Sequence, residues 1–173
     1  MRPQAKKKLV CFISSYISVY LFVMRVVIQR VSHAQVAVKG NVIGKIDHGL
    51  LVLVGITHED TQDDVNWLCK KIVGLRIFDD AHGVMNKSVQ EDNGEILAIS
   101  QFTLFAATKK GNRPSYIRAA KHEVAIPLYN QFCDTLSQLM KKPIQRGSFG
   151  ADMQVELLND GPVTICIDSK NKE

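Results

Sequence analysis

The chain has 173 residues, of which 46% are hydrophobic and 23% charged, and these values are ordinary for a soluble globular protein built as a single domain. Its four cysteines are scattered without a CxxC pair and its five histidines form no HExxH motif, which argues against a structural or catalytic metal site. Isolated cysteines are typical of a reducing compartment, so we expect a cytoplasmic protein that needs no metal and no other cofactor.

The net charge of +5 is spread unevenly along the chain. Residues 1–23 contribute four positive charges and no acid, and residues 105–150 carry eight basic and two acidic residues. The rest of the chain is therefore net negative. Such asymmetry is typical of a surface that faces a polyanion, although a solvated charged face explains it equally well at this point.

The first 23 residues differ from the rest of the chain. A basic cluster precedes the apolar run 9–24, as in a signal peptide, but no small-x-small cleavage site follows. The run is also short for a membrane span, which needs about 20 apolar residues. We expect Met24 to be the true start, residues 1–23 to be an appendage or upstream-start artefact, and no stable membrane association. Attachment to a membrane through residues 9–23 is the alternative.

Residues 25–75 predict three strands followed by a helix. The third strand, residues 50–56, is apolar on both faces, so it should be central and covered on both sides. The helix should begin after Thr61, because Asp64 lies three residues further on and the two side chains can form a capping pair. Its apolar residues then recur at spacings of three and four, which places them on one face.

The second half of the chain continues the alternation of strands and helices. We expect a hairpin turned at Asp80–Gly83, a strand over residues 94–105 and a basic loop over residues 107–120. A second helix should follow, with Pro127 in its first turn or at a kink. Its expected apolar face comprises Val124, Leu128, Phe132, Leu136 and Leu139. Several antiparallel strands covered by two helices make an α+β domain.

The stretch "LLNDGPVTICI", residues 157–167, interrupts a strand pattern with a proline. A proline cannot donate to a strand ladder, and Asp160–Gly161 is a strong turn signal, so the simplest interpretation is a hairpin within residues 153–168. A second interpretation makes Gly161–Pro162 a rigid backbone device with a function. The two are compatible, because a hairpin tip can carry such a device.

Polar side chains also interrupt the apolar strand that contains "ISQFTLFA", residues 99–106. Ser100, Gln101 and Thr103 either face solvent on a half-exposed strand, or present hydroxyl, amide and backbone N–H groups to a ligand. No histidine lies near this segment in the sequence, so no Ser-His-Asp or Cys-His set is evident.

Five segments together resemble the D-aminoacyl-tRNA deacylase (D-tyrosyl-tRNA deacylase) family in order and spacing: "MRVVIQRVSHAQVAV", "GLLVLVGI", "SQFTL", "GNRPSY" and "MQVELLNDGPVT". SQFTL and the Gly-Pro of NDGPVT are the signatures of this family. The resemblance defines a domain over residues 24–168 and a short tail, 169–173. It implies a single-domain, DTD-like α+β fold, in which antiparallel strands form a barrel-like sheet covered by two helices, and a homodimer.

The resemblance also implies the reaction and its partner. These enzymes bind tRNA and hydrolyse the ester that joins a D-amino acid, or mischarged glycine, to the 3′-terminal adenosine. A cis Gly161–Pro162 peptide of one subunit would enter the active site of the other and reject L-amino acids through its backbone. Arg30 would brace that loop, unless it makes only a surface salt bridge.

The catalytic residues implied by the resemblance are Ser100, Gln101, Phe102 and Thr103. Backbone N–H groups around Gln101–Thr103 should hold the ester carbonyl oxygen, while the 2′-OH of the terminal ribose assists hydrolysis. Ser100 and Gln101 would bond the adenosine, and Phe102 would pack on the substrate end. Met153 either lines the adenine pocket or belongs to the core.

The basic loop gains a role in the same comparison, since phosphate contacts position a nucleic acid without reading its sequence. Lys109, Lys110 and Arg113 are therefore the expected tRNA-binding residues. Two alternatives stay open: a hydrolase that uses Thr103 as nucleophile on the same substrate, and a non-catalytic RNA-binding dimer inferred from charge alone.

Overall fold

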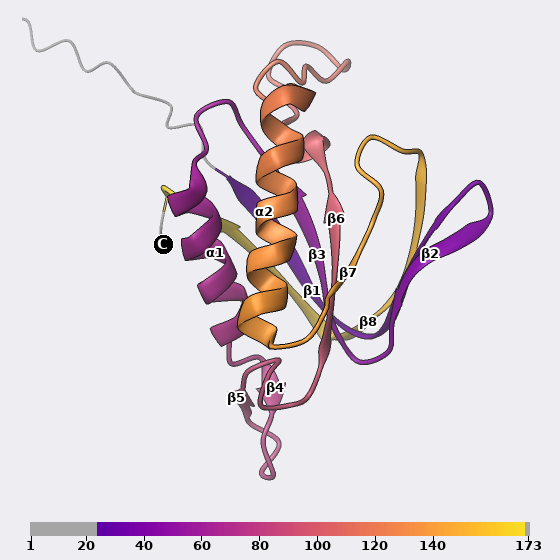
Figure 1. Ribbon diagram of the computed structural model, residues 1–173, viewed down its shortest axis with the longest axis vertical. Helices are drawn as coiled ribbons and strands as arrows, with labels where there is room; N and C mark the ends of the chain where they lie inside the picture. Colours follow the sequence, from indigo (N-terminus) through magenta and orange to yellow (C-terminus); the bar gives the residue numbers. More distant parts are fainter. Residues whose placement is uncertain (1–23, 172–173) are drawn as a thin grey trace, which may run out of the picture.

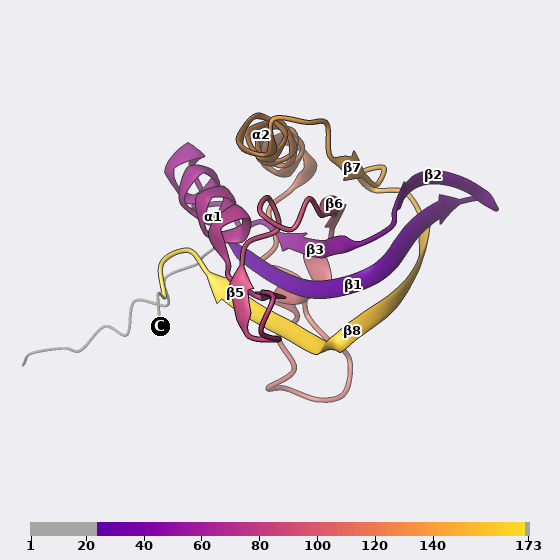
Figure 2. The ribbon, with the colours of Figure 1, turned by 90° about the horizontal axis from the view of Figure 1, so that it is seen from below.

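In the computed structural model, which describes residues 24–171, a curved sheet carries two long helices on one side (Figures 1 and 2). The predicted α+β class is confirmed. The described elements are, in chain order, β1 (Arg25–Val38), β2 (Asn41–Ile46), β3 (Gly49–Gly55), α1 (Gln62–Gly74), β4 (Phe78–Asp79), β5 (Met85–Lys87), β6 (Glu95–Ser100), the 3-10 helix η1 (Phe102–Phe105), α2 (His122–Met140), β7 (Gln145–Arg146) and β8 (Met153–Asp168).

Strand β1 organises the sheet. Along one edge it pairs with β8 over its whole length, and along the other edge with β3 and then β2, always antiparallel. Strand β3 pairs with β6, and β6 with β7, in parallel. The sheet is therefore mixed rather than antiparallel throughout, because helix α1 lies in the connection from β3 to β6 and lets the chain return in the same direction.

The sheet separates two clusters of buried apolar side chains. The larger cluster lies between the sheet and the helices, and the smaller one lies inside the curl of the sheet, which β2 and β7 nearly close where they meet. Strand β3 supplies both clusters, with Val52 in the larger and Leu51 in the smaller. Its predicted position as a central strand covered on both faces is confirmed, since alternate side chains of a strand point to opposite faces.

Both helices lie close to their predicted ranges. In α1 the expected cap is present, because the N–H and the hydroxyl of Thr61 donate to Asp64 Oδ2 at 2.9 and 3.1 Å. Helix α2 begins at His122, so Pro127 lies in its second turn and not in its first. Its buried face is also shifted by about one residue from the expected one and comprises Ala125, Tyr129, Phe132, Cys133, Leu136 and Met140.

The expected hairpin within residues 153–168 is wrong, because β8 is one continuous strand along β1. Val31 pairs with Asn159 and Gln29 with Thr164, so residues 160–163 bulge out opposite the single residue Arg30. The Asn159 side-chain amide closes this bulge by donating to the carbonyls of Arg30 and Val163 at 2.9 and 3.0 Å. The Gly161–Pro162 peptide bond within it is cis. The turn signal therefore produces a bulge, since the 14 residues of β1 offer both halves of β8 a partner.

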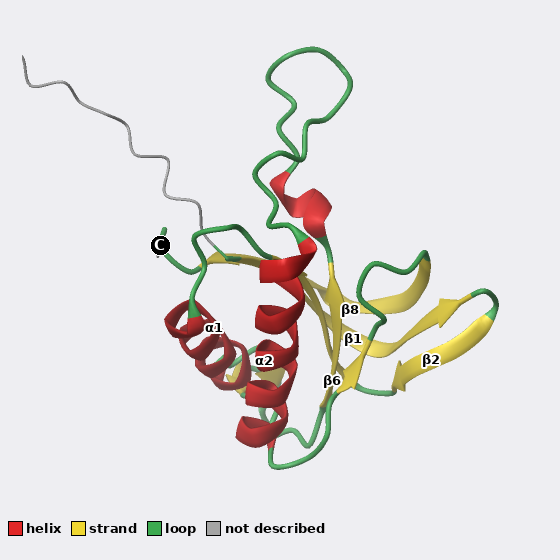
Figure 3. Cartoon of the chain, turned by 45° about the horizontal axis from the view of Figure 1, so that its top comes forward, coloured by secondary structure: helices red, strands yellow, loops and turns green. Residues whose placement is uncertain are grey.

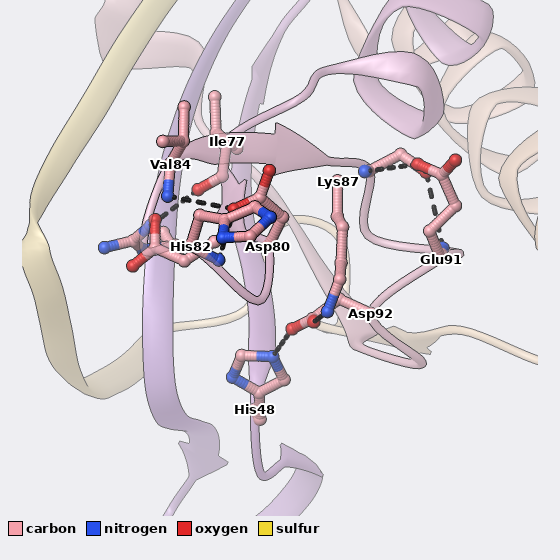
Figure 4. Close-up of polar contacts among 11 residues, drawn as sticks. His48, Ile77, Asp80, His82, Val84, Lys87, Glu91 and Asp92 are labelled. Atoms are coloured by element: carbon pink, nitrogen blue, oxygen red, sulfur yellow. Dashed lines mark hydrogen bonds and ion pairs between the residues drawn. The ribbon is translucent and has the colours of Figure 1, made fainter.

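The hairpin β4–β5 does turn at Asp80–Gly83, as predicted. Asp80 Oδ1 accepts the backbone N–H groups of His82 and Val84 at 2.8 and 3.2 Å, which fixes the turn (Figure 4). Nearby, His48 Nε2 lies 2.5 Å from Asp92 Oδ2, and these two side chains join the start of β3 to the segment that follows β5.

Among residues 24–171, no helix is long and apolar enough to cross a membrane. The apolar run 9–23 lies outside the described residues. Met24, by contrast, belongs to the core: its side chain is fully buried and its carbonyl accepts the N–H of Ser169 at 2.9 Å.

We expect a chain that begins at Met24 to match the full-length protein in thermal stability and activity, because the described residues already supply two clusters of buried apolar side chains. Thermal unfolding and enzyme assays on the two forms test this directly. Loss of activity on truncation, or recovery of the full-length form in a membrane fraction, would show that residues 1–23 matter.

Candidate active site

A cavity of about 680 Å³ opens where β3 and β6 end, beside the N-terminus of α2. Its walls come from the ends of these two strands, the start of η1, the loop before α2, the first turn of α2, residues 149–151 and the start of β8. The mouth of a parallel strand pair next to a helix N-terminus is a common place for a ligand site in mixed sheets.

The predicted strand over residues 94–105 is wrong beyond Ser100, because most of the SQFTL segment leaves β6. The strand ends at Ser100, the N–H of Gln101 donates to the carbonyl of Val54 at 2.7 Å, and residues Phe102–Phe105 wind into η1 (Figure 3). Gly55 makes room for this turn, because a Cβ there would lie 2.8 Å from the Phe105 ring and 3.1 Å from Leu104 Cβ. The absence of a side chain at the end of β3 thus allows η1 to fold back onto the sheet.

The structure brings four of the predicted residues together, since Ser100, Gln101, Phe102 and Met153 all line the cavity. Phe102 is 56% exposed and meets the ring of Tyr116 edge-on at 5.1 Å, so the two rings form one rim of the opening. Thr103 does not line the cavity, and its hydroxyl accepts a hydrogen bond from the side-chain amide of Gln101.

The geometry of η1 narrows the choice of oxyanion donors. The N–H of Gln101 is already bonded to Val54, so it is not free for a ligand. The N–H groups of Phe102 and Thr103 open the helix, where the first donors have no acceptor within the turn. They are the two donors that this segment can offer to a carbonyl oxygen.

The N-terminus of α2 was not predicted as part of the site, although its N-cap Lys121 and the first-turn residues His122 and Glu123 line the cavity. Phe149, whose ring lies 5.7 Å from the rings of both His122 and Tyr129, was not predicted either. The signal that could have found them is the helix predicted directly after the basic loop. That helix alone did not indicate a place in the site, because the antiparallel sheet expected from the sequence gave no reason to set its N-terminus beside the ends of β3 and β6.

The basic loop rises above the N-terminal end of α2 (Figure 1). Backbone hydrogen bonds of 2.8 and 3.0 Å between Ala107 and Ser115 close it, and Lys109, Lys110 and Arg113 lie exposed on it. The segment that follows Ser115 forms part of the cavity wall. The three cations are therefore carried by the same loop that borders the site.

The bulge with Gly161 and Pro162 does not line the cavity of its own chain. Arg30, which is buried beneath it, donates to the carbonyl of Ile77 at 2.6 Å, and its Nε lies 3.1 Å from Asp160 Oδ2. Gly161 has a φ of +119°, and a Cβ there would lie 3.1 Å from Arg30 Nη2. Arg30 thus contacts the bulge of its own chain, and its predicted role toward a second subunit stays a prediction.

The sequence profile of the D-Tyr-tRNA(Tyr) deacylase family matches residues 27–168. The chain belongs to this family. A protein named D-aminoacyl-tRNA deacylase from Bacteroides thetaiotaomicron is 66% identical over 150 residues, which are 87% of this chain and 100% of that protein. A protein of the same name from Flavobacterium psychrophilum is 61% identical over the same shares of both chains.

Two solved structures of similar fold extend the comparison. The c-Myc DNA Unwinding Element Binding Protein is 43% identical with a TM-score of 0.78, over 83% of this chain and 97% of that one. A probable eukaryotic D-amino acid tRNA deacylase has a TM-score of 0.73 over 84% of this chain and 98% of that one. Its 17% identity supports the fold alone.

One buried acid of this deacylase-family chain lies next to a wall of the cavity. The N–H of Thr57 donates to Asp60 Oδ2 at 2.6 Å, and the preceding Ile56 bonds through its carbonyl to the N–H of Ala120 at 2.9 Å. Ile56 and Ala120 both line the cavity. Burial raises the pKa of the Asp60 carboxyl to about 6, although hydrogen bonds from Thr57 oppose part of the shift.

This pKa predicts a pH-dependent stability. Because the pKa of Asp60 is higher in the folded protein than its ordinary 3.8, the folded state binds more protons between about pH 4 and 6, and stability falls as the pH rises through that window. Asp60→Asn keeps an oxygen for Thr57 and does not titrate. Between pH 4.5 and 7, urea unfolding should show wild type losing about 2 kcal/mol relative to this variant. Parallel stability curves for the two proteins would contradict the prediction.

Proposed function

We propose that the protein is a tRNA-editing hydrolase that cleaves the ester between a D-amino acid and the 3′-terminal adenosine of tRNA, releasing the two as separate molecules. Glycine mischarged on tRNA is the second substrate class. The observation that carries the proposal is the cavity into which the SQFTL segment opens at the end of β6. Membership of the deacylase family and the names of the relatives support the same reaction.

The walls of the cavity suit an aminoacyl-adenosine. Phe149 and Met153 offer flat and flexible apolar surface for the adenine, and Ser100 and Gln101 offer hydrogen bonds. The free N–H groups at the start of η1 would hold the ester carbonyl oxygen and stabilise the negative charge that develops on it. The cations of the basic loop would contact the phosphates of the acceptor stem.

The attacking water would be assisted by the substrate and not by a protein base. The Thr103 hydroxyl is bonded to the amide of Gln101, which cannot take up a proton, and Thr103 is not among the residues that line the cavity. The 2′-OH of the terminal ribose lies next to the scissile ester in every substrate, so it needs only correct orientation. The role of the protein is then to bind, to orient and to stabilise the oxyanion.

Selection against L-amino acids would come from a second copy of the chain. On β8 the last residue that lines the cavity is Val155, and Gly161 lies six residues further, about 20 Å along an extended strand. The Gly161–Pro162 bulge therefore cannot serve the cavity of its own chain. We infer that it enters the cavity of a twofold-related partner, where backbone carbonyls bind the substrate amino group and leave no space for an L-side chain.

A homodimer follows from this arrangement and has its own test. In the described part of the chain β8 pairs only with β1, and Leu158 on this strand is 54% exposed. A partner that covers this surface would protect an open sheet edge. Analytical ultracentrifugation should give about twice the 19.3 kDa of one chain. A fully active monomer would rule out a site shared between subunits.

The reaction itself is tested by incubating the purified protein with D-Tyr-tRNA and following loss of the ester. Wild type should release D-tyrosine, and Ala151→Phe, which narrows the cavity, should reduce that release strongly. Ala81→Phe on the exposed turn of β4–β5 is the matched control and should behave as wild type. Binding of tRNA without ester loss would instead support the non-catalytic RNA-binding alternative.

A further inference from the structure

Arg25 is the first residue of β1, and its side chain extends to η1. It is not among the residues that line the cavity. Its Nε and Nη2 atoms donate to the two carboxylate oxygens of Asp168 at 2.7 and 2.9 Å. Its Nη1 donates to the carbonyl of Leu104 at 3.2 Å, and the guanidinium lies 5.6 Å from the centre of the Phe105 ring. One side chain thus joins the last residue of β8 to the end of η1.

The sheet register explains why an arginine fits here. Arg25 lies opposite Asp168 on β8 and opposite Gly55 on β3, so it has an acid on one side and, on the other, a glycine on which Leu104 and Phe105 pack. The planar fork of a guanidinium can bind a carboxylate with two donors and keep further donors for a carbonyl. The hydrogen bonds with Asp168 raise the pKa of Arg25, so the charge is firmly held.

Arg25 is one of several contacts that hold η1. The turn is held at its start by the bond from Gln101 to Val54, and it rests on Gly55, where a Cβ would collide with Phe105. Arg25 holds its far end through Leu104. The first two contacts place η1 on the sheet, and the hydrogen bond from Arg25 acts on its far end.

We propose that Arg25 is a positioning residue for ester hydrolysis, which keeps η1 oriented so that the N–H groups of Phe102 and Thr103 meet the substrate carbonyl oxygen. The inference rests on the proposed function of the cavity. Oxyanion donors act only at hydrogen-bond distance from the developing charge, and loss of one donor typically costs about 100- to 1000-fold in rate. A tilted turn misplaces both donors without removing either one.

The two steady-state constants should therefore respond differently. Arg25→Gln is expected to lower kcat by about 10- to 100-fold. KM should stay within about threefold, because Phe102 is the only residue of η1 among the described residues that line the cavity. Arg25→Lys keeps the charge but loses the planar guanidinium, so its kcat should lie between that of wild type and that of Arg25→Gln. Asp168→Asn should lower kcat in the same direction, since it weakens the anchor of the guanidinium.

The matched control is Arg76→Gln. Arg76 also donates from its guanidinium to a backbone carbonyl, that of Asn86 at 2.9 Å, but it does not line the cavity. This variant should keep the kcat and KM of wild type. Thermal unfolding of each variant shows whether the fold is kept, and if Arg25→Gln does not fold, Arg25→Lys and Asp168→Asn provide the same test.

The outcomes separate the two levels of the proposal. If wild type does not hydrolyse D-Tyr-tRNA, the proposed function fails, whatever the Arg25 variants do. If wild type is active and folded Arg25 variants keep its kcat, or lose no more kcat than Arg76→Gln, the positioning role is overturned. A fall in kcat graded from Lys to Gln at nearly constant KM supports it.

Discussion

D-Tyr-tRNA that ends in 2′-deoxyadenosine is expected to be hydrolysed at least about 100-fold more slowly than the normal substrate, although it should still bind. The reason is that the 2′-OH lies next to the scissile ester, so its removal takes away the proposed assistance. Thr103 is bonded to an amide and does not line the cavity, and the His122 ring, which does line it, packs on Phe149. Single-turnover hydrolysis of the two tRNA forms at saturating protein measures the difference.

Thr103→Ala is the complementary variant, and it should keep most of the wild-type activity. The change removes the hydroxyl but leaves the backbone N–H of residue 103 at the start of η1. Serine and threonine nucleophiles depend on a neighbouring base, so a true nucleophile would lose nearly all turnover on this change. Full activity on the deoxy substrate, together with an inactive Thr103→Ala, would favour a covalent mechanism over assistance by the 2′-OH.

Gly161→Ala should reduce turnover of D-Tyr-tRNA by about tenfold or loosen the discrimination against L-Tyr-tRNA, without unfolding the domain. Gly161 has a φ of +119°, which disfavours any side chain, and a Cβ would lie 2.8 Å from Val163 Cγ2. Either the bulge or Arg30 must then move. Parallel assays on D- and L-Tyr-tRNA give the ratio of the two rates.

Gly83→Ala is the matched control for this change. Gly83 also has a positive φ, of +73°, but nothing lies within 4 Å of a Cβ there, and the residue sits in the turn of β4–β5. This variant carries a similar backbone penalty without touching the bulge, so its D to L ratio should equal that of wild type. If Gly161→Ala shows the same unchanged ratio, the bulge does not set chiral selectivity.

Local patterns were sufficient to predict most of the elements. The Thr61–Asp64 cap, the turn at Asp80–Gly83 and the two-faced β3 all depend on residues a few positions apart, and all three are present. The bulge at residues 160–163 depends instead on pairing with Arg30, about 130 residues away in the chain. A turn signal alone cannot reveal that a long partner strand holds both flanks in line.

The candidate site divides in the same way. Ser100, Gln101 and Met153 were recognisable from their segments and do line the cavity. Thr103 lies in η1 and is not among the residues that line the cavity, and the fold of η1 depends on Gly55 of a different strand. Likewise, the first turn of α2 borders the cavity at the ends of the parallel strands β3 and β6, whereas the sequence had indicated an antiparallel sheet.

The most direct test of the account is the relative rate at which the protein hydrolyses matched D- and L-Tyr-tRNA. The two substrates differ only in the direction of one side chain, so the assay isolates the proposed exclusion by a partner backbone. We expect the D-ester to be cleaved about 100-fold faster or more, while the L-ester survives at the same protein concentration. Equal rates on both substrates would contradict the account.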